Sequence, residues 1–307
     1  MKDTTFFRQA DLLVRVLPFV RAEECFALKG GTAINLFVRD FPRLSIDIDL
    51  VYLPIADRPA SLRGIHDALR RIGEKIRRAV PGVQVHEQRS QDSRLVAKLV
   101  VQERAGAQIK IEPNHVLRGA LHPTVERTLA PKAQAIFERM ATARVISVPE
   151  LYGGKICAAL DRQHPRDLFD VHGLFQHEGL TDDIRKAFIV FLASHDRPMN
   201  ELLSPNRKNL QRVYADEFSG MTTLTPVPLA ALEEVREQLI AKVNADLTAA
   251  EREFLLSLKM MQPKWELLGL PGVERLPGPQ WKLYNLRKMK PEKHAEAVAQ
   301  LKNKLGL

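Results

Sequence analysis

Cysteine is scarce and long apolar runs are missing from this sequence of 307 residues. The two cysteines, Cys25 and Cys157, each stand in an apolar context, which excludes a disulfide-stapled fold and favours buried, reduced thiols. No apolar run approaches the ~18 residues of a membrane span. The opening Met-Lys runs into DTTFFRQA, without the apolar stretch of a signal peptide. We therefore expect a soluble, cytoplasmic protein with no membrane partner.

Several common catalytic arrangements are also missing. No serine lies in a nucleophile elbow, and neither cysteine is placed for thiolate chemistry. The 9 histidines, among them His164, His172 and His177, follow no zinc-ligand spacing, so we expect them in solvated or capping positions. Serine or cysteine hydrolases and zinc enzymes are therefore disfavoured.

Basic residues outnumber acidic ones. There are 46 Lys and Arg against 37 Asp and Glu, a formal net charge of +9, which suits a polyanionic partner. Charge alone does not single out nucleic acid, because many proteins are basic without binding it. Apolar residues make up 45% of the chain, enough to build a core in one large domain or two modest ones. No exposed apolar heptad stands out, and we expect a monomer.

The spacing of apolar residues changes character along the chain. In the first part, helical spacing over 4–21, 32–38 and 61–80 alternates with strand-like runs at 25–28, 45–53, 82–87, 94–102 and 107–113. From about residue 149 the pattern is helical, over 148–163, 165–176, 181–195, 228–247 and 248–260, with a proline-rich loop at 261–281 and a basic C-terminal helix.

This change predicts an α+β fold in two parts. A mixed, mostly antiparallel sheet with helices on one side is expected in a domain over residues 1–145. A largely α-helical domain over residues 146–307 is expected to follow and to complete an active-site cleft.

An acidic pair lies in the strand-like run SIDIDLVYL. Asp47 and Asp49 are two residues apart, so in a strand their side chains project to the same face while Ile48 points the other way. Two ionised carboxylates at this spacing repel each other and require a counter-charge. A divalent cation such as Mg²⁺ or Mn²⁺ would supply it. The alternative is a solvent-facing edge strand with polar alternation.

A glycine pair precedes that strand. Gly30 and Gly31 follow an apolar strand and come just before a short helix expected to begin near Thr32. Such a turn lets backbone N–H groups approach an anion, and Thr32 can cap the helix or reach a phosphate oxygen. A tight turn that simply needs glycine is the alternative. Together with the acidic pair, the turn suggests a bound nucleoside triphosphate and its metal.

A third acid is expected on a neighbouring strand. Phosphoryl transfer with two metals commonly uses another carboxylate close to the attacking hydroxyl. In AQIKIEPN, Glu112 lies in an apolar strand with Lys110 on the same face. An exposed Lys/Glu strand edge is the alternative, but the acidic pair favours Glu112 as a catalytic and metal-binding acid.

The helical part carries a second group of charges. Lys155 lies within an apolar helix, where it either reaches the surface or faces the active site. Asp167 and Asp170 share one face of the next helix, and Arg166 could form a structural ion pair with Asp167. Lys155 could stabilise charge that builds up during nucleotidyl transfer.

Two basic segments could contact RNA. The cluster RRIGEKIRR is most simply the solvated face of its helix. The segment KLYNLRKMKPEKH is the better RNA-binding candidate, because Trp281 and Tyr284 accompany five basic residues from Lys282 to Lys293. A solvated tail is the alternative there.

The order of these motifs resembles a known signature. A strand, Gly-Gly-Thr, a helix, a D-x-D strand and a later acid resemble the polymerase β-type nucleotidyltransferases, with a longer glycine-to-aspartate spacing than the commonest form. GGKICAALDR followed by RDLFD, with ALKGGTAINLF and the KIE strand, is similar to the AbiEii/AbiGii toxin family over essentially the whole chain. The resemblance implies a polymerase β-type mixed sheet followed by a helical domain.

The resemblance also implies roles for individual residues. It implies Gly31 and Thr32 for phosphate, Asp47 and Asp49 for metal, Lys155 for nucleotide binding or catalysis and Asp167 as a further catalytic-site acid. The family's glycine is often followed by serine, whereas Thr32 follows a glycine pair here. Which of Gly31 and Thr32 touches phosphate therefore stays open.

In this family the toxin is paired with a separately encoded antitoxin, commonly a DNA-binding regulator that forms no stable complex with it. Related toxins add nucleotides to the 3′ ends of tRNAs and so stop translation, and the family is linked to abortive infection and phage defence. The resemblance implies the same for this chain: an NTP as donor, Mg²⁺ or Mn²⁺ as cofactor and an RNA acceptor, most specifically tRNA. A protein hydroxyl or a small molecule as acceptor, and a non-catalytic RNA- or partner-binding protein, are the alternatives.

Overall fold

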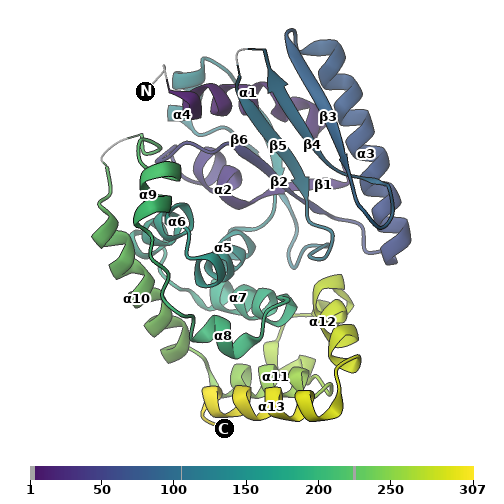
Figure 1. The fold of residues 1–307 in the computed structure, drawn as a ribbon, viewed down its shortest axis with the longest axis vertical. Coiled ribbons are helices and arrows are strands. Elements are labelled where there is room, and N and C mark those ends of the chain that lie inside the picture. The colour runs from purple at the N-terminus through teal and green to yellow at the C-terminus, as the bar shows by residue number, and fades with distance from the viewer. Residues whose placement is uncertain (1–3, 105, 224–225) are drawn as a thin grey trace. The chain divides into compact units, whose positions relative to one another are not determined.

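The computed structural model describes residues 4–104, 106–223 and 226–307 (Figure 1). Contacts within the chain divide it into two units: Met1–Ser147 with Ser219–Pro226, and Val148–Phe218 with Val227–Leu307. The first unit holds the sheet and the second is helical, which confirms the predicted α+β class with a mixed sheet.

Within the described residues, the sheet of the first unit has seven strands in the order β3-β4-β5-β2-β1-β7-β6. Their bounds are β1 Phe26–Lys29, β2 Asp47–Tyr52, β3 Val83–Arg89, β4 Val96–Glu103, β5 Gln108–Pro113, β6 Val125–Thr128 and β7 Thr142–Val145. The pairs β2–β5 and β1–β7 are parallel and the others antiparallel. The centre of the sheet is therefore β5-β2-β1, where the predicted acids lie.

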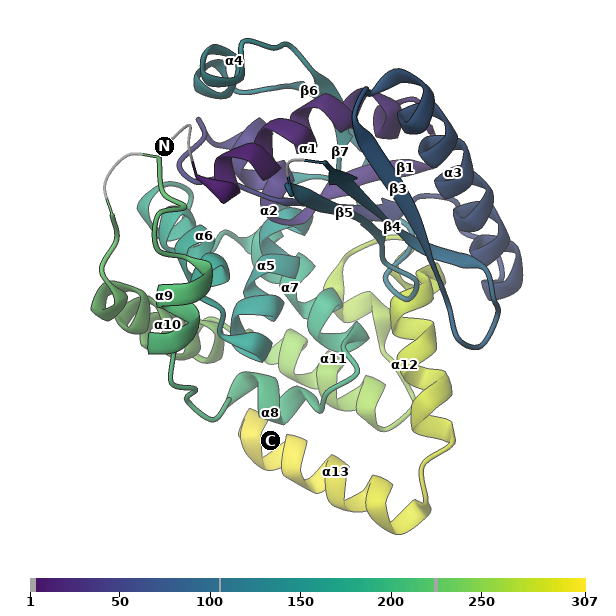
Figure 2. The same ribbon diagram turned by 45° about the horizontal axis from the view of Figure 1, so that its top comes forward.

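Two long helices cover one face of the sheet. Helix α1 (Thr5–Arg21) contacts β1, β5 and β7, while α3 (Arg58–Ala79) contacts β3 and β4 and also touches α1 (Figure 2). In α3, residues such as Leu69, Ile72 and Ile76 form the buried stripe that the sequence predicts. Asp57 caps the helix by accepting a hydrogen bond from the Ala60 N–H at 2.7 Å.

Several elements of the first unit differ from the prediction. The short helix begins at the glycine pair itself, as α2 (Gly30–Ala33), and continues as a π-helical turn over Ile34–Val38. Sequence reasoning missed β6, β7 and the short helix α4 (Pro131–Phe137). Strands of four residues with alternating charge, such as VERT in β6, give too short a pattern to be recognised. A returning segment also joins this unit, since the Leu44 N–H bonds the Met221 carbonyl at 2.8 Å.

The second unit is a helical array. Its helices are α5 Val148–Arg162, α6 Pro165–Gln176, α7 Asp182–Ser194, α8 Met199–Leu203, α9 Gln211–Glu217, α10 Leu229–Ala245, α11 Ala249–Lys259, α12 Pro277–Arg287 and α13 Pro291–Leu305. Helices α5 and α7 approach closely because Gly153 lacks a side chain: a Cβ there would lie 2.7 Å from the Phe188 backbone nitrogen. This packing fixes α5, which carries Lys155.

The predicted proline-rich loop over residues 261–281 is partly wrong. Single 3₁₀ turns form at Trp265–Leu268 and Val273–Arg275, and α12 begins at Pro277, inside the stretch expected to be a loop. Proline is well tolerated in the first turn of a helix, where its missing N–H would have no helical partner. None of the helices in the described part of the chain has the length and apolar character needed to cross a membrane.

Candidate active site

The acidic strand has the two faces that its alternation predicts. Along β2, Ile48 and Leu50 are fully buried, whereas Asp47 and Asp49 are only half-buried. The apolar side chains lie in the core, and the two carboxylates share the opposite face. Desolvation of the acids is therefore partial, and they remain accessible to an external cation.

The parallel pairing of β2 with β5 brings a third acid alongside. Asp49 is opposite Glu112, and Asp47 is opposite Lys110. Residues opposite each other in a sheet project to the same face, so Glu112 joins the acidic pair. Sequence reasoning missed its partner: Lys98 Nζ on β4 lies 2.9 Å from Glu112 Oε1.

The glycine turn lies directly against the second aspartate. Gly30 has φ +70°, and a Cβ at this position would be 2.4 Å from Asp49 Oδ2. Only glycine fits, because a side chain would both collide with the carboxylate and require a left-handed backbone. At Gly31, a Cβ would lie 2.7 Å from Nη2 of Arg43, a buried arginine that sequence reasoning did not single out.

Thr32 is fully buried beneath this turn. Its hydroxyl donates to the Asp47 carbonyl oxygen at 2.5 Å and lies 2.8 Å from the Ser45 hydroxyl. These bonds tie α2 to the start of β2 and so help to position the backbone of Asp47. Phosphate binding by Thr32 stays a prediction, whereas a positioning role follows from the contacts.

The acids could form an open cation site, in which substrate and water supply the other ligands. Among the described residues, no group of three or more His, Cys, Asp or Glu side chains is arranged to hold a metal ion. Asp47 and Asp49 supply hard oxygen ligands, and Mg²⁺ is commonly held by one or two carboxylates together with substrate phosphates and water. Glu112 could join such a site only by exchanging its ion pair with Lys98.

The second group of charges forms a buried cluster in the helical unit. Lys155 Nζ on α5 lies 2.7 Å from Asp167 Oδ1 and 3.0 Å from Asp170 Oδ2, both on α6. All three residues are more than nine-tenths buried. Arg162 also bonds Asp167, with Nη2 2.9 Å from Oδ1. Among the contacts described, two cations thus face two carboxylates in this cluster.

The electrostatics of Asp167 follow from these contacts. Burial alone would raise the pKa of its carboxyl group, but the charges of Lys155 and Arg162 outweigh burial and hold the pKa well below its ordinary value. At the first turn of α6, Asp167 pairs with Lys155 and Arg162, while Arg166 lies 3.6 Å from Glu217.

His164 takes a capping position and Cys157 is buried, as the sequence predicts, whereas Cys25 is only half-buried. His164 caps α6, its Nδ1 accepting from the Arg166 N–H at 3.1 Å, and burial lowers the pKa of its ring. Burial raises the pKa of the Cys25 thiol to about 11 and that of Cys157 further still. Neither thiol is therefore a nucleophile at neutral pH.

Several residues of the basic cluster on α3 form ion pairs. Arg71 and Lys75 both pair with Glu23, at 2.7 and 3.2 Å, and Arg77 pairs with Glu87 at 3.5 Å. Residues with an acidic partner offer little to a polyanion, which agrees with the prediction of a solvated helix face.

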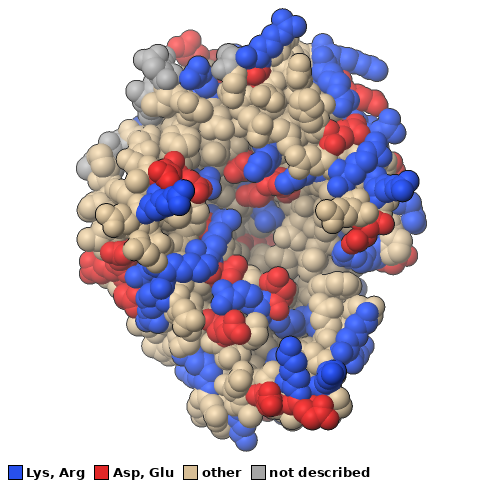
Figure 3. Space-filling view, viewed as in Figure 1, with Lys and Arg blue, Asp and Glu red and all other residues tan. Residues whose placement is uncertain are grey.

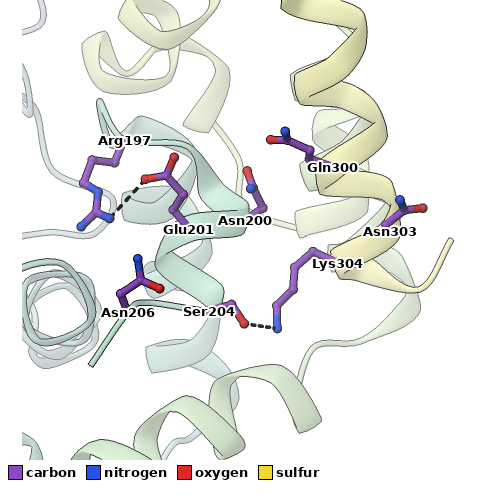
Figure 4. A pocket seen from close by; sticks show the side chains of 8 residues that line it. All are labelled: Arg197, Asn200, Glu201, Ser204, Asn206, Gln300, Asn303 and Lys304. Atoms are coloured by element: carbon purple, nitrogen blue, oxygen red, sulfur yellow. Dashed lines mark hydrogen bonds and ion pairs between the residues drawn. The ribbon is translucent and has the colours of Figure 1, made fainter. Parts of the chain in front are cut away.

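A polar hollow of about 440 Å³ lies in the helical unit, between α8 and α13 (Figure 4). It is lined by Arg197, Asn200, Glu201, Ser204, Asn206, Gln300, Asn303 and Lys304. Inside it, Arg197 pairs with Glu201 at 3.2 Å and Lys304 donates to the Ser204 hydroxyl at 3.1 Å. It contains none of the predicted site residues.

Comparison with known proteins identifies the family. The family model for AbiEii, a nucleotidyl transferase toxin of type IV toxin–antitoxin systems, matches residues 11–274. No curated protein sequence matches the chain. Among solved structures, the fold is similar to that of MenT4, a nucleotidyltransferase toxin from Mycobacterium tuberculosis H37Rv, with 16% identity, a TM-score of 0.60 and coverage of 97% of this chain and 93% of that one. The chain therefore belongs to the AbiEii family of nucleotidyl transferase toxins.

Proposed function

We propose that this toxin transfers a nucleoside monophosphate from an NTP to an RNA acceptor in the cytoplasm, with Mg²⁺ or Mn²⁺ as cofactor. The 3′ end of a tRNA is the specific acceptor that we propose, and capping that end would block translation and growth. Membership of a nucleotidyl transferase toxin family supports the reaction class. The net charge of +9 supports a polyanionic acceptor.

One observation carries the proposal: the acids and the glycine turn lie together in the first unit. Asp47 and Asp49 share a face of β2, Glu112 is opposite Asp49 on β5, and Gly30 presses against the Asp49 carboxylate. A glycine turn next to paired carboxylates offers a phosphate chain and its cation adjacent partners. An exposed polar strand edge would not need a left-handed glycine packed against one of its acids.

Each predicted residue then has a role. Asp47 and Asp49 hold the cation, which would offset the charge of these carboxylates and of the phosphates. The turn formed by Gly30, Gly31 and Thr32 holds the phosphates. The acceptor hydroxyl oxygen forms a bond to the α-phosphorus while the bond to the pyrophosphate oxygen breaks.

The remaining residues manage the proton and the charge. The hydroxyl proton passes to Glu112, and pyrophosphate leaves. Asp167 is the second candidate base, but its ion pairs with Lys155 and Arg162 keep it ionised and make it a weaker proton acceptor. Lys155 stabilises the triphosphate either directly or by holding Asp167 in place, since its ammonium group contacts both Asp167 and Asp170.

The test is to incubate the purified protein with total tRNA, Mg²⁺ and each α-labelled NTP in turn. Asp49→Asn, which keeps the size of the side chain, should abolish labelling. Asp92→Asn, an exposed acid in the same unit, is the matched control and should label normally. Omission of Mg²⁺ with EDTA present should give the same loss as Asp49→Asn.

The position of the label decides between acceptors. Label on RNA that requires Asp49 supports the proposal, and its release by a 3′ exonuclease locates the added nucleotide. Label on protein would show that the acceptor is a protein hydroxyl rather than RNA. Label on a small molecule would show that the acceptor is a metabolite. No label with any NTP would contradict the proposed activity.

A further inference from the structure

An aromatic stack lies on the surface of α12. Trp281 and Tyr284 are three residues apart and so share a helix face, with ring centroids 5.2 Å apart and an interplanar angle of 23°. Tyr284 is 45% exposed, which makes it one of the few large apolar side chains in the described structure that face solvent. Exposed aromatic rings offer flat surfaces on which other rings can stack.

Exposed cations without acidic partners follow this stack along the chain. Lys288 Nζ lies 4.1 Å from the centre of the Tyr284 ring, and Arg287, Lys290 and Lys293 are exposed nearby. Within the described parts of the chain, none of these four cations has a carboxylate within 4.0 Å. Figure 3 shows Lys and Arg side chains over α12 and its turn into α13.

The arginines elsewhere in the helical unit differ in this respect. Those that form ion pairs with Asp or Glu are Arg162, Arg166, Arg185, Arg197, Arg207, Arg212, Arg236 and Arg275. The cations after Tyr284 thus form a local surplus of positive charge. A polyanion that binds there gains attraction without first breaking an internal ion pair.

The opposite face of α12 anchors the helix. Lys282 is buried and donates to the carbonyl oxygens of His195 at 2.6 Å and Arg197 at 3.0 Å, just beyond the end of α7. Leu283 and Leu286 are buried on the same side. The sequence counted Lys282 among the basic surface residues, and the structure corrects this. The aromatic face is held on a fixed helix, so little order has to be gained on binding.

We infer that this face of α12 and its continuation binds a single-stranded segment of the RNA acceptor. We call it the α12 platform: Trp281, Tyr284, Arg287, Lys288, Lys290 and Lys293. The bases stack on the exposed Tyr284 ring, which the half-buried Trp281 supports from behind, and the cations contact the phosphates. The inference rests on the proposed function, because it assumes that RNA is the acceptor. An acidic peptide would contact the cations, but it would have no rings to stack on Trp281 and Tyr284.

The α12 platform lies outside the segment matched by the family model. That segment ends at residue 274, and α12 begins at Pro277. The predicted catalytic residues all precede it. Platform variants should therefore weaken RNA binding and leave transfer to saturating RNA intact.

The experiment measures binding of a short, fluorescein-labelled, single-stranded oligoribonucleotide to the full-length protein by anisotropy at several NaCl concentrations. Tyr284→Ala should weaken binding about tenfold, whereas Tyr284→Phe keeps the ring and should bind as the wild type does. Stacking should also quench tryptophan fluorescence, and this quenching should disappear in Trp281→Phe while Trp265 still fluoresces.

Charge is tested separately with Lys288→Gln/Lys290→Gln/Lys293→Gln. The slope of log affinity against log salt is negative, and removal of three phosphate contacts should reduce its magnitude by about 2, since each contact contributes about 0.7 on single strands. Lys302→Gln, an exposed lysine on α13, is the control and should leave the slope unchanged. These surface variants should fold even if Tyr284→Ala does not, so unchanged affinity and slope in the lysine variant would overturn the inference.

Two further outcomes separate the inference from the proposed function. Platform-dependent RNA binding without any transfer of label would uphold the α12 platform and contradict the proposed acceptor. Label on RNA, together with normal RNA affinity in every platform variant, would uphold the proposed acceptor and overturn the α12 platform. Equal competition by polyglutamate and by a single-stranded RNA of matched charge would show that rings play no part, and would overturn the inference.

Discussion

The two groups of predicted site residues balance their charges in opposite ways. On the sheet, Asp47 and Asp49 are half-buried on one strand face, and Glu112 has its salt bridge with Lys98. In the helical unit, Lys155 lies within 3.0 Å of two buried carboxylates, so each of these buried charges has an opposite charge beside it. The half-buried sheet acids are therefore accessible to a ligand, while the buried helical cluster contributes to the fold itself.

This difference predicts different costs of mutation. Removing one of two repelling, half-exposed carboxylates leaves no buried charge behind, so stability should change little. Removing one partner from a buried cluster leaves an uncompensated charge in a low-dielectric interior, which is strongly destabilising. Activity and stability should thus separate in the sheet and change together in the helical unit.

The largest effect is expected for Asp49→Asn. Loss of a carboxylate ligand should reduce nucleotidyl transfer by roughly 1000-fold or more, because a bound cation contributes several kcal/mol to the transition state. The midpoint of thermal unfolding should stay the same or rise, since one repulsive charge is gone. Transfer assays and calorimetry on the same preparation test both parts. A large fall in unfolding temperature would mean that the acids are structural.

The next largest effect is expected for Asp167→Ala. Its loss would leave Lys155 and Arg162 with less negative charge around them, at a cost of about 3–5 kcal/mol in unfolding free energy. Denaturant unfolding measures the change. Asp216→Ala is the control, because it breaks an exposed ion pair with Arg212 and should cost less than about 1 kcal/mol. Equal losses in the two variants would refute the contrast.

The cluster also predicts a pH dependence. The pKa of Asp167 is held below its ordinary value of 3.8, so the unfolded state binds the proton more readily. The stability that the ionised group contributes is complete above the unfolded pKa and is lost as the pH falls through and below it. The difference in unfolding free energy between the wild type and Asp167→Asn should therefore be constant from about pH 7 to pH 5 and shrink below about pH 4. A difference that grows on acidification would contradict the assignment.

Sequence reasoning succeeded where a local pattern determines the geometry. The period of two along a strand placed Asp47 and Asp49 on one face, and the helical period placed Asp167 and Asp170 together. Both patterns depend only on neighbours along the chain. The roles assigned to these residues remain predictions, because they concern ligands.

The partners that sequence reasoning missed come from other strands, loops and helices. Lys98 meets Glu112 through the register of β4 against β5, and Arg43 packs over Gly31 through a loop. Neither register nor loop path can be read from apolar spacing alone. The same holds for Lys282, whose burial depends on the docking of α12 at the end of α7.

Gly30→Ala sharpens the comparison inside the sheet unit. The added methyl group meets Asp49 Oδ2 at 2.4 Å and the backbone has φ +70°, so we expect a loss of about 1–3 kcal/mol in stability together with a loss of transfer. Gly82→Ala is the matched control, with φ +76° and open space around the Cβ. The excess effect at Gly30 measures the contact with Asp49. If Gly30→Ala and Gly82→Ala changed stability and activity equally, the turn and Asp49 would be independent.

The smallest effect on stability is expected for Lys98→Met. The ion pair with Glu112 is about one-third exposed on each side, so its loss should cost less than about 1 kcal/mol. The freed carboxylate, now close to Asp49 without a neutralising cation, should bind divalent cations more tightly. Titration of Mn²⁺ followed by electron paramagnetic resonance measures this affinity without any turnover, and Lys98→Arg preserves the ion pair as the control. Unchanged Mn²⁺ affinity in Lys98→Met would place Glu112 outside the cation site and leave proton transfer as its remaining role, so this variant decides between the two functions proposed for that acid.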